Sequence, residues 1–311
     1  MKILCCGIFP ALQRTLELKT LKTGSVNRVR SVTQSVGGKA TNAARVLNTL
    51  GADPLLFGFA GGETGETIKH LLDEEGIEHA FVETDVPTRT SQTLLADDAH
   101  DFTEIIEDCE PIVSKGWKNL IKKFQGLEKA SDAIILSGTL PIHVPQEIYC
   151  ELLRGTENKI VIIDTPGAPL LAALETRPTL VKINATELLK STIQSDDRAS
   201  ELEIEEAAKE LIAQGAGAVG ITQGPDAALL VTPDKTIQFS IPKVAVKSTL
   251  GCGDSVNAGI AFALQKGSSL KEAFLFGLAC GAANAQTAMP GVVDLEQIAQ
   301  LAKEITSTDL H

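Results

Sequence analysis

The residues best suited to chemistry lie in a glycine-rich turn that is followed by an acidic residue and an apolar helix. The run TLGCGD ends at Asp254, and a helix is expected over 254–264. Glycines before a helix let free backbone N–H groups approach a ligand, so Gly251, Cys252 and Gly253 predict an anion site. Asp254 beside that anion would accept a proton from an attacking hydroxyl, as phosphoryl transfer requires. Alternatively, Asp254 only caps the helix.

A second glycine-rich turn opens an earlier predicted helix, in the run GGKATN that ends at Asn42. Its backbone N–H groups, with Lys39 and Asn42, suit the hydroxyls or a phosphate of a small polar substrate. Gly38 lets the backbone approach that substrate closely. The alternative is a tight turn without a ligand, with Asn42 in the first helical turn.

Polar residues follow a buried strand in the run KINATE, which begins at Lys182. Asn184 and Glu187 are three residues apart and share a face if a helix starts there. The carboxyl end of a strand is where α/β folds bind ligands, and this pair would hold Mg²⁺ and its waters near phosphates. Alternatively, Asn184 caps the helix and Glu187 completes a capping box.

Other strand ends carry weaker signals. Thr222 and Gly224 end one strand and suit either a phosphate or a simple turn. Thr139 lies in a loop after another strand and would face the same cleft. Arg89 lies in an extended segment, where it either clamps a phosphate or is an ordinary surface arginine.

The elements that would position these residues alternate between short apolar segments and segments of helical periodicity. Strands are expected over 3–9, 54–59, 133–136, 160–163, 180–183 and 218–222. Helices are expected over 41–50, 64–75, 145–153, 204–214, 254–264 and 270–287. Strands that are apolar on both faces and joined through helices predict an α/β fold, with a doubly wound, mostly parallel sheet and helices on both faces.

Two segments, 15–32 and 88–97, interrupt this rhythm because they alternate in polarity. Alternation predicts a small β-sheet that is exposed on one face. Near a site such a sheet would act as a lid. We therefore expect a single domain over 1–311, with a lid formed by about 12–34 and 87–108.

The composition disfavours several classes of protein. The 311 residues include 28 Lys and Arg against 40 Asp and Glu, a net charge of −12, which argues against nucleic acid and anionic membranes as partners. Six cysteines without C-x-x-C and five scattered histidines argue against structural zinc and suit a cytoplasmic protein. The longest uncharged stretch, 273–293, contains Asn, Gln and Pro and is expected to be a buried helix rather than a membrane span.

Motifs of several common enzyme classes are also missing. The sequence has no G-x-x-x-x-G-K-[ST], no H-R-D with D-F-G and no G-x-S-x-G. The glycines at 58, 61, 62 and 65 do not form G-x-G-x-x-G. Walker-type NTPases, protein kinases, α/β-hydrolases and Rossmann dehydrogenases are therefore disfavoured.

In combination and in order, these elements resemble the ribokinase-like (phosphofructokinase-B) family of carbohydrate kinases, in its 1-phosphofructokinase and tagatose-6-phosphate kinase branch. Two family signatures are recognisable, GGKATNAARVLNTLGADPLLFGFAGGETG over 37–65 and STLGCGDSVNAGIAFAL over 248–264. LSGTLP, VIIDTPG, KINATEL and CGAANAQT also match. The resemblance runs from Ile3 to the C-terminal helices, and it implies a ribokinase-like fold with a β lid and a homodimer formed through the lid.

The resemblance also implies a role for each candidate residue. Asp254 would be the general base, and the anion hole would be Gly251, Cys252 and Gly253. The acceptor would be held by Gln13, Gly38, Lys39, Asn42, Arg89 and Thr139, the last two on its phosphate. ATP would be held by Lys182, Asn184, Thr222, Gly224, Gly253 and Asn284, and Mg²⁺ by Asn184 and Glu187.

Some residues depart from the family pattern. The first strand of this branch normally ends N-P-A-x-D, and its Asp binds sugar hydroxyls, whereas this chain has Phe9 and Gln13 there. A site that loses a charged acceptor changes the hydroxyl pattern that it accepts. Cys252 replaces the usual Ala, Ile183 a usual Pro and Ala227 a usual Gly.

The sequence thus predicts an ATP- and Mg²⁺-dependent kinase that phosphorylates a hydroxyl of a ketohexose monophosphate. Two alternatives stay open at this point. The acceptor is an unphosphorylated sugar or a nucleoside, as Phe9 and Gln13 suggest, or the chain is a non-catalytic sugar- or nucleotide-binding regulator.

Overall fold

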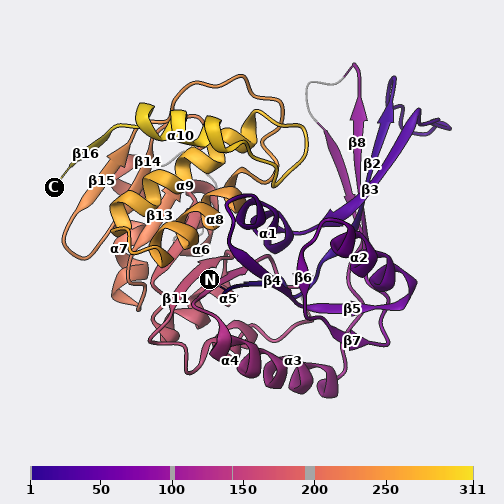
Figure 1. Ribbon diagram of the computed structural model, residues 1–311, viewed down its shortest axis with the longest axis horizontal. Helices are drawn as coiled ribbons and strands as arrows, with labels where there is room; N and C mark the ends of the chain where they lie inside the picture. Colours follow the sequence, from indigo (N-terminus) through magenta and orange to yellow (C-terminus); the bar gives the residue numbers. More distant parts are fainter. Residues whose placement is uncertain (1, 99–101, 142, 193–199, 311) are drawn as a thin grey trace.

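A long, mostly parallel sheet forms the centre of the molecule. The computed structural model describes residues 2–98, 102–141, 143–192 and 200–310. In this part of the chain ten strands form the sheet, in the order β16-β15-β14-β13-β12-β11-β10-β1-β4-β6 (Figure 1). The strands from β6 to β13 in this order are parallel, and β14, β15 and β16 add an antiparallel edge. Their bounds are β1 Lys2–Cys6, β4 Asp53–Phe57, β6 Glu78–His79, β10 Ala133–Ser137, β11 Ile160–Asp164, β12 Leu180–Asn184, β13 Val219–Thr222, β14 Ala228–Val231, β15 Thr236–Phe239 and β16 Ser307–Asp309.

Helices cover both faces of this sheet, and each face has its own apolar core. One core joins the sheet to α1, α2, α8, α9 and α10, and the other joins it to α3, α4, α5, α6 and α7. Their bounds are α1 Lys39–Thr49, α2 Gly62–Glu74, α3 Ser114–Leu127, α4 Ile148–Leu153, α5 Ala168–Ala173, α6 Ala185–Thr192, α7 Glu201–Ala213, α8 Cys252–Gln265, α9 Leu270–Ala285 and α10 Leu295–Glu304. The predicted doubly wound α/β fold is therefore confirmed.

Element boundaries differ from the prediction where capping, rather than periodicity, decides them. The helix expected over 204–214 begins at Glu201, because Ser200 and Glu203 form a reciprocal capping box. The first strand ends at Cys6 rather than at residue 9, and the chain then turns away from the central sheet. Apolar periodicity finds the buried part of an element and misses its polar ends.

A second, smaller sheet stands apart from the main body. In the described residues its strands run in the order β3-β2-β8-β9, with bounds β2 Ala11–Leu18, β3 Ser31–Gly37, β8 Thr90–Ala96 and β9 Thr103–Ile106. Figure 1 shows β2, β3 and β8 projecting from the body beside α1 and α2. A short pair, β5 Phe59–Gly61 and β7 Val82–Thr84, lies near its base. We call the four strands β2, β3, β8 and β9 the small sheet.

The expected continuous alternation over 15–32 is wrong in its middle. β2 ends at Leu18 and β3 begins only at Ser31. Between them the Asn27 side chain accepts a hydrogen bond from the Lys22 N–H and donates one to the Lys22 carbonyl, which folds a loop. Val26 is 87% exposed in that loop, so the apparent polarity pattern had no buried face.

Connectivity places the small sheet beside the GGK turn. β3 runs on to Gly37, where it pairs with Ala11 of β2, and α1 begins two residues later at Lys39. Gly38 adopts φ 129°, a left-handed value that favours glycine. The turn is therefore the direct junction between the small sheet and the body.

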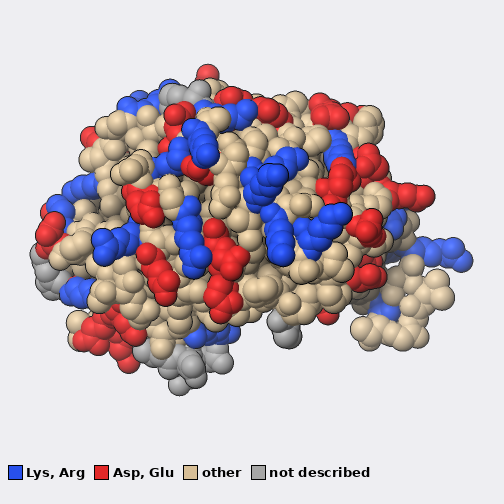
Figure 2. Space-filling view, turned by 90° about the horizontal axis from the view of Figure 1, so that it is seen from below, with Lys and Arg blue, Asp and Glu red and all other residues tan. Residues whose placement is uncertain are grey.

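No helix in the described ranges is long and apolar enough to cross a membrane. On the face shown in Figure 2, Lys and Arg side chains are interspersed with Asp and Glu rather than gathered into one broad basic surface.

Close packing of α8 on α9 gives the first testable prediction. A Cβ on Gly277 would lie 2.6 Å from the Val256 carbonyl oxygen and 2.6 Å from Ile260 Cγ1, so Gly277→Ala should lower the free energy of unfolding by about 1–3 kcal/mol. Gly126 in α3 is exposed with nothing within 4 Å of such a Cβ, so Gly126→Ala should be neutral or stabilise slightly. Urea unfolding of both variants checks this, and equal effects would contradict it.

Candidate active site

The N-terminus of α8 forms the centre of the candidate site. Gly251 adopts φ 78°, and a Cβ there would lie 2.7 Å from Pro290 Cβ, so both conformation and space require glycine. Among the described residues, the N–H groups of Gly253 and Asp254 in the first helical turn have no backbone partner, and the Cys252 N–H makes one long bond of 3.4 Å to the Thr249 carbonyl. The turn thus presents donors and the positive end of the helix dipole, as an anion site needs.

Asp254 lies in this first turn and is 7% exposed. Its Oδ2 accepts a hydrogen bond of 2.8 Å from Asn42 Nδ2 of α1. Burial, helped by the nearby Asp164 carboxylate, raises the pKa of Asp254 to about 6 against the opposing effects of Asn42, Lys39 and Lys182. A carboxylate with a raised pKa at the mouth of an anion site is suited to accept a proton.

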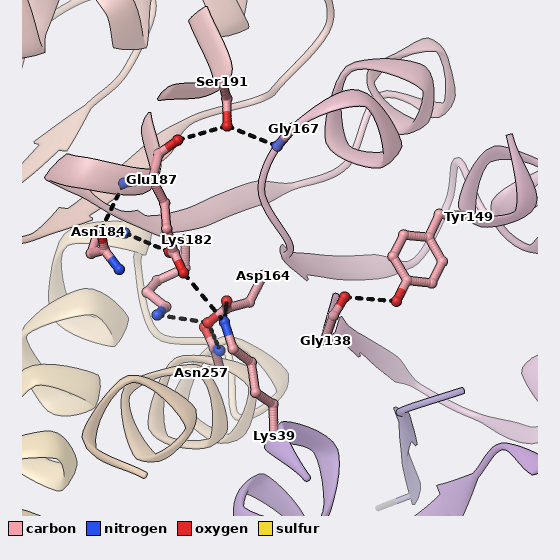
Figure 3. Close-up of polar contacts among 10 residues, drawn as sticks. All are labelled: Lys39, Gly138, Tyr149, Asp164, Gly167, Lys182, Asn184, Glu187, Ser191 and Asn257. Carbon is pink, nitrogen blue, oxygen red and sulfur yellow. Dashed lines mark hydrogen bonds and ion pairs between the residues drawn. The ribbon is translucent and has the colours of Figure 1, made fainter. Parts of the chain in front are cut away.

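Asp164, at the carboxyl end of β11, holds the two lysines of the site (Figure 3). Its Oδ1 lies 2.6 Å from Lys39 Nζ, and its Oδ2 lies 2.6 Å from Lys182 Nζ. Asn257 Nδ2 of α8 donates to the same Oδ2 at 2.6 Å. Although burial opposes it, the charges of Lys182 and Lys39 hold the pKa of Asp164 well below its usual range.

The side chain of Lys182, which belongs to β12, lies against the start of α8. Its side chain is 5% exposed, and its Nζ lies 2.8 Å from the point that a Cβ on Gly253 would occupy. Only glycine at 253 leaves room for this ammonium group. The lysine therefore adds a full positive charge to the helix N-terminus that is expected to hold phosphate.

Asn184 and Glu187 form the capping arrangement that was the alternative to a metal site. The Glu187 N–H donates to Asn184 Oδ1 at 2.8 Å, and the Asn184 N–H donates to Glu187 Oε2 at 3.4 Å. Ser191 fastens this turn by donating to the Glu187 carbonyl and accepting from the Gly167 N–H (Figure 3). Glu187 Oε1 lies 3.8 Å from Lys39 Nζ, so its carboxylate faces the Asp164 cluster.

The donor set fits magnesium only in the form in which phosphates and water supply most ligands. In the described residues no three His, Cys, Asp or Glu side chains are grouped to hold a metal ion. Mg²⁺ in phosphoryl-transfer sites is often held by one or two carboxylates together with substrate phosphates and water. Glu187 is 27% exposed and is compatible with that role, whereas Asn184 Oδ1 already accepts a backbone hydrogen bond.

The other predicted strand-end residues lie along the same edge of the sheet. Thr222 pairs in register with Asn184 across β12 and β13, and Gly224 follows with φ 64°. Thr139 is exposed just after β10, and the Gly138 N–H before it donates to the Asp164 carbonyl. The structure thus gathers these residues at the carboxyl ends of neighbouring strands.

Asn284 has a different setting from the one that the resemblance implied. Its side chain is fully buried, and it donates to the Leu250 carbonyl at 2.7 Å and to Cys252 Sγ at 3.4 Å. Its Oδ1 accepts from the Gly291 N–H at 2.7 Å. The side chain therefore positions the anion turn, and its contact with ATP stays a prediction.

At the base of the small sheet, Gln13 Nε2 donates to Thr93 Oγ1 at 2.7 Å. Since that bond uses the amide nitrogen, Gln13 presents its carbonyl oxygen, a neutral acceptor where the family has a carboxylate. Phe9 packs its ring against Phe59 and Trp117, at centroid distances of 6.0 Å each. The family's polar residue at that position is thus replaced by part of an apolar cluster.

Arg89 lies beside this cluster. One of its guanidinium nitrogens donates to the Phe9 carbonyl at 3.4 Å, and its buried Nε has no hydrogen-bond partner. Together with Phe9 it lines a cavity of about 20 Å³, room for about one water molecule. An unsatisfied guanidinium donor is a physical reason to expect an anionic ligand here.

Sequence reasoning assigned no role to Asp164 or Asn257. A signal for Asp164 was available, because this charged residue directly follows the apolar segment 160–163 and precedes a turn. Asn257 lies three residues after Asp254 and so shares its face of α8, toward Asp164. The pattern of apolar helix residues gave no indication of this partner.

The chain is similar to known proteins along nearly its whole length. Residues 2–295 match the model of the pfkB family of carbohydrate kinases. Phosphofructokinase-2 from Escherichia coli, solved with fructose-6-phosphate, is 25% identical, with 98% of each chain covered and a TM-score of 0.87; the same enzyme has a tetrameric inhibited form. A possible 1-phosphofructokinase from Thermotoga maritima is 20% identical over 100% of both chains, with a TM-score of 0.88. Ribokinase from Thermotoga maritima is 20% identical over 97% of this chain and 99% of its own, with a TM-score of 0.78.

The site and the fold define a phosphotransferase with an alcohol group as acceptor. The chain belongs to the pfkB family of carbohydrate kinases. The expected resemblance and the enzyme class are thereby confirmed, and a non-catalytic regulator is set aside.

The two buried aspartates give a second prediction, with opposite signs. The pKa of Asp254 is raised from 3.8 to about 6 in the folded chain, so its ionisation costs stability as pH rises from 3.8 to about 6, and the cost levels off above that. Asp254→Asn should therefore raise the free energy of unfolding at pH 8 by up to about 3 kcal/mol, with no gain near pH 4.

Asp164→Asn is the matched comparison, because it is the same change at a second buried aspartate. It leaves Lys39 and Lys182 without their counter-charge and should cost about 3–5 kcal/mol at pH 8. Urea unfolding between pH 4 and pH 8 checks both. Destabilisation by both variants at pH 8 would contradict the assignment of opposite shifts.

Proposed function

We propose that this kinase transfers the γ-phosphoryl group of ATP to a hydroxyl of a ketohexose monophosphate. The observation that carries the proposal is the buried Asp254 at the donor-rich start of α8, joined through Asn42 to the GGK turn. A proton acceptor, an anion site and a polar substrate turn within hydrogen-bond contact of one another are the parts that this reaction needs.

In the proposed reaction, Asp254 takes the proton of the acceptor hydroxyl while the hydroxyl oxygen forms a bond to the γ-phosphorus. The bond from that phosphorus to the β-phosphate oxygen breaks, and ADP leaves. The N–H groups of Cys252 and Gly253, with Lys182, stabilise the charge on the transferred group. Asn42 orients the acceptor, and Thr222 and Gly224 lie where the nucleotide phosphates would extend along the sheet edge.

Glu187 is proposed to hold Mg²⁺ with its water ligands, with Asn184 fixing the turn. The ion would neutralise phosphate charge when it is bound. Lys39 lies between Asp164 and Glu187, so it is suited to balance the charge that moves from ATP to the acceptor.

The small sheet is proposed to close over the acceptor as a lid and to exclude water. Its exposed apolar side chains, Val32, Leu95, Ile105 and Ile106, support a homodimer formed through this sheet. All the cysteines in the described residues are free, which suits the reducing environment of the cytoplasm.

The acceptor is the part of the proposal that this chain's own residues make distinctive. Gln13 offers a neutral oxygen, and Phe9 is apolar, so hydroxyl recognition differs from that of a site with a carboxylate there. The Arg89 Nε, which has no hydrogen-bond partner among the described residues, and Lys39 of the GGK turn favour a phosphorylated acceptor. An unphosphorylated sugar or nucleoside is the second candidate, supported by the loss of the polar Asn and Asp of the family.

The proposed activity is tested by ADP release from Mg·ATP with a panel of acceptors. The panel contains fructose-1-phosphate, fructose-6-phosphate, tagatose-6-phosphate, fructose, ribose and adenosine. Turnover confined to a phosphosugar is expected. With that acceptor, Asp254→Asn should lose most of its turnover yet still bind ATP. Turnover of the wild-type enzyme should decrease as the pH is lowered below about 6, because Asp254 then becomes protonated.

Undiminished turnover of Asp254→Asn would show that another group accepts the proton. Turnover only on fructose, ribose or adenosine would overturn the phosphosugar assignment and leave the kinase class intact.

Arg89 gives a separate prediction about substrate phosphate. Arg89→Ala should raise the KM for the phosphosugar by about 10- to 100-fold, because one charge-assisted contact is lost, with a smaller effect on kcat. The KM for ATP serves as the internal control and should stay within about twofold. A fall in kcat at an unchanged KM would contradict the phosphate contact.

A further inference from the structure

Arg45 of α1 is buried one turn after Asn42 and makes no contact that the reaction itself requires. Its side chain is 7% exposed. Its Nε and one terminal nitrogen donate to the two carboxylate oxygens of Glu75, at 2.6 Å and 2.8 Å. Glu75 immediately follows α2 and is 27% exposed, so this ion pair joins α1 to the end of α2.

The remaining donors of Arg45 point back toward the site. Its Nη1 donates to Asn42 Oδ1 at 3.2 Å. Its Nη2, the terminal nitrogen that contacts Glu75, also donates to the Val36 carbonyl at 2.9 Å. Asn42 Nδ2 donates to Asp254 Oδ2 at 2.8 Å. A continuous chain of hydrogen bonds therefore runs from Glu75 through Arg45 and Asn42 to Asp254.

This chain fixes which way the Asn42 amide faces. A guanidinium group has donors and no acceptor, so Arg45 requires the oxygen of the amide on its side. The nitrogen then faces Asp254, and the hydrogen bond that it donates favours the ionised carboxylate over the protonated carboxyl group. The opposite orientation would place the amide oxygen against Asp254 and would favour a protonated carboxyl group.

Packing leaves the Asn42 backbone little freedom to relieve this constraint. A Cβ on Gly291 would lie 2.7 Å from the Asn42 carbonyl oxygen and 3.2 Å from Arg45 Cβ, so the 290–291 turn presses directly on this part of α1. The same turn is held by Asn284 and packs against Gly251 of the anion turn. The amide orientation is therefore decided by the side-chain contacts.

We propose that Arg45, anchored by Glu75, is a positioning residue that keeps Asp254 ready to accept a proton by fixing the Asn42 amide. The proposal rests on Asp254 being the general base. Other groups also act on Asp254: Lys39 from α1, Lys182 from β12 and Asp164 from β11. None of them is changed by a substitution at Arg45, so the effect of Arg45 can be separated from theirs.

The test compares Arg45→Met with the double variant Arg45→Met/Glu75→Gln. The double variant leaves no unpaired carboxylate behind and is the safer one for folding. In both, the acidic limb of kcat/KM for the best acceptor of the panel should move up by about one pH unit, an effect of about fivefold at pH 6, with little change at pH 8.5.

A second readout needs no acceptor. The stability midpoint, by which we mean the pH at which the stabilisation by Asp254→Asn levels off, should also rise by about one unit when Arg45 is replaced by Met, because this upper limit is set by the pKa of Asp254 in the folded chain. In an Asn42→Ala background, Arg45→Met should add no further shift, because the amide through which it acts is absent. Glu128→Gln, which breaks the distant partly buried Lys159–Glu128 pair, is the control and should leave both midpoints unmoved.

An unmoved midpoint in both folded Arg45 variants would overturn the proposal, as would an equal loss of activity at every pH with a lower melting temperature. Full turnover of Asp254→Asn would instead overturn the base assignment. The stability midpoint would still report whether Arg45 controls the Asp254 carboxylate.

Discussion

The buried carboxylate of Asp164 is the interaction on which the site depends. It lies 2.6 Å from the ammonium groups of Lys39, at the start of α1, and Lys182, in the neighbouring strand β12. It also accepts a hydrogen bond from Asn257 of α8. Three elements that are far apart in sequence are thus fixed to a single strand end. Two cations at an anion site, Lys182 buried and Lys39 half-buried, would repel each other, and one buried anion between them offsets that repulsion. Burial raises the pKa of Asp254 to about 6, and the Asp164 charge adds to this rise while the two lysines oppose it. The lysines of the cluster also attract phosphate, so the same charges act on the anion site and on the proposed base.

Close packing around glycines brings these charges near enough to matter. Gly253 leaves the space that the Lys182 ammonium group occupies, and Gly251 makes room for Pro290. Gly291 lies against Asn42 on the other side, and its N–H is tied to the buried Asn284. The 290–291 turn therefore contacts both the anion turn and the start of α1. A change in one of these two loops is transmitted to the other through backbone contact, which links the proposed nucleotide side to the proposed acceptor side.

Much of the architecture could be predicted from the sequence because it depends on local patterns. Segments such as 133–136 and 160–163 are apolar on both faces, and only a covered parallel sheet accommodates them. The anion turn and Asp254 could also be found, since glycines before a helix have a local physical meaning. The role of Asp164 could not be predicted, because its partners Lys39 and Lys182 are 125 and 18 residues away. A single sequence carries no signal of that pairing. The loop around Val26 was misjudged for the opposite reason: alternation implies a strand only when one face is buried, and burial is a tertiary property.

The replacements at the base of the small sheet show why fold and class are determined more firmly than the acceptor. The Phe9 ring packs against Phe59 and Trp117, and the amide nitrogen of Gln13 donates to Thr93. Neither change reaches Asp254, Asp164 or the turn at Gly251, whose contacts lie within the main body. The chemistry of phosphoryl transfer and the hydroxyl contacts at Gln13 are therefore built on different elements, which are joined at Gly37 and Gly38. Such a division lets the acceptor site change while the proton acceptor and the phosphate site stay as they are, because a substitution on β2 alters hydroxyl contacts without moving the charges that stabilise the transferring group.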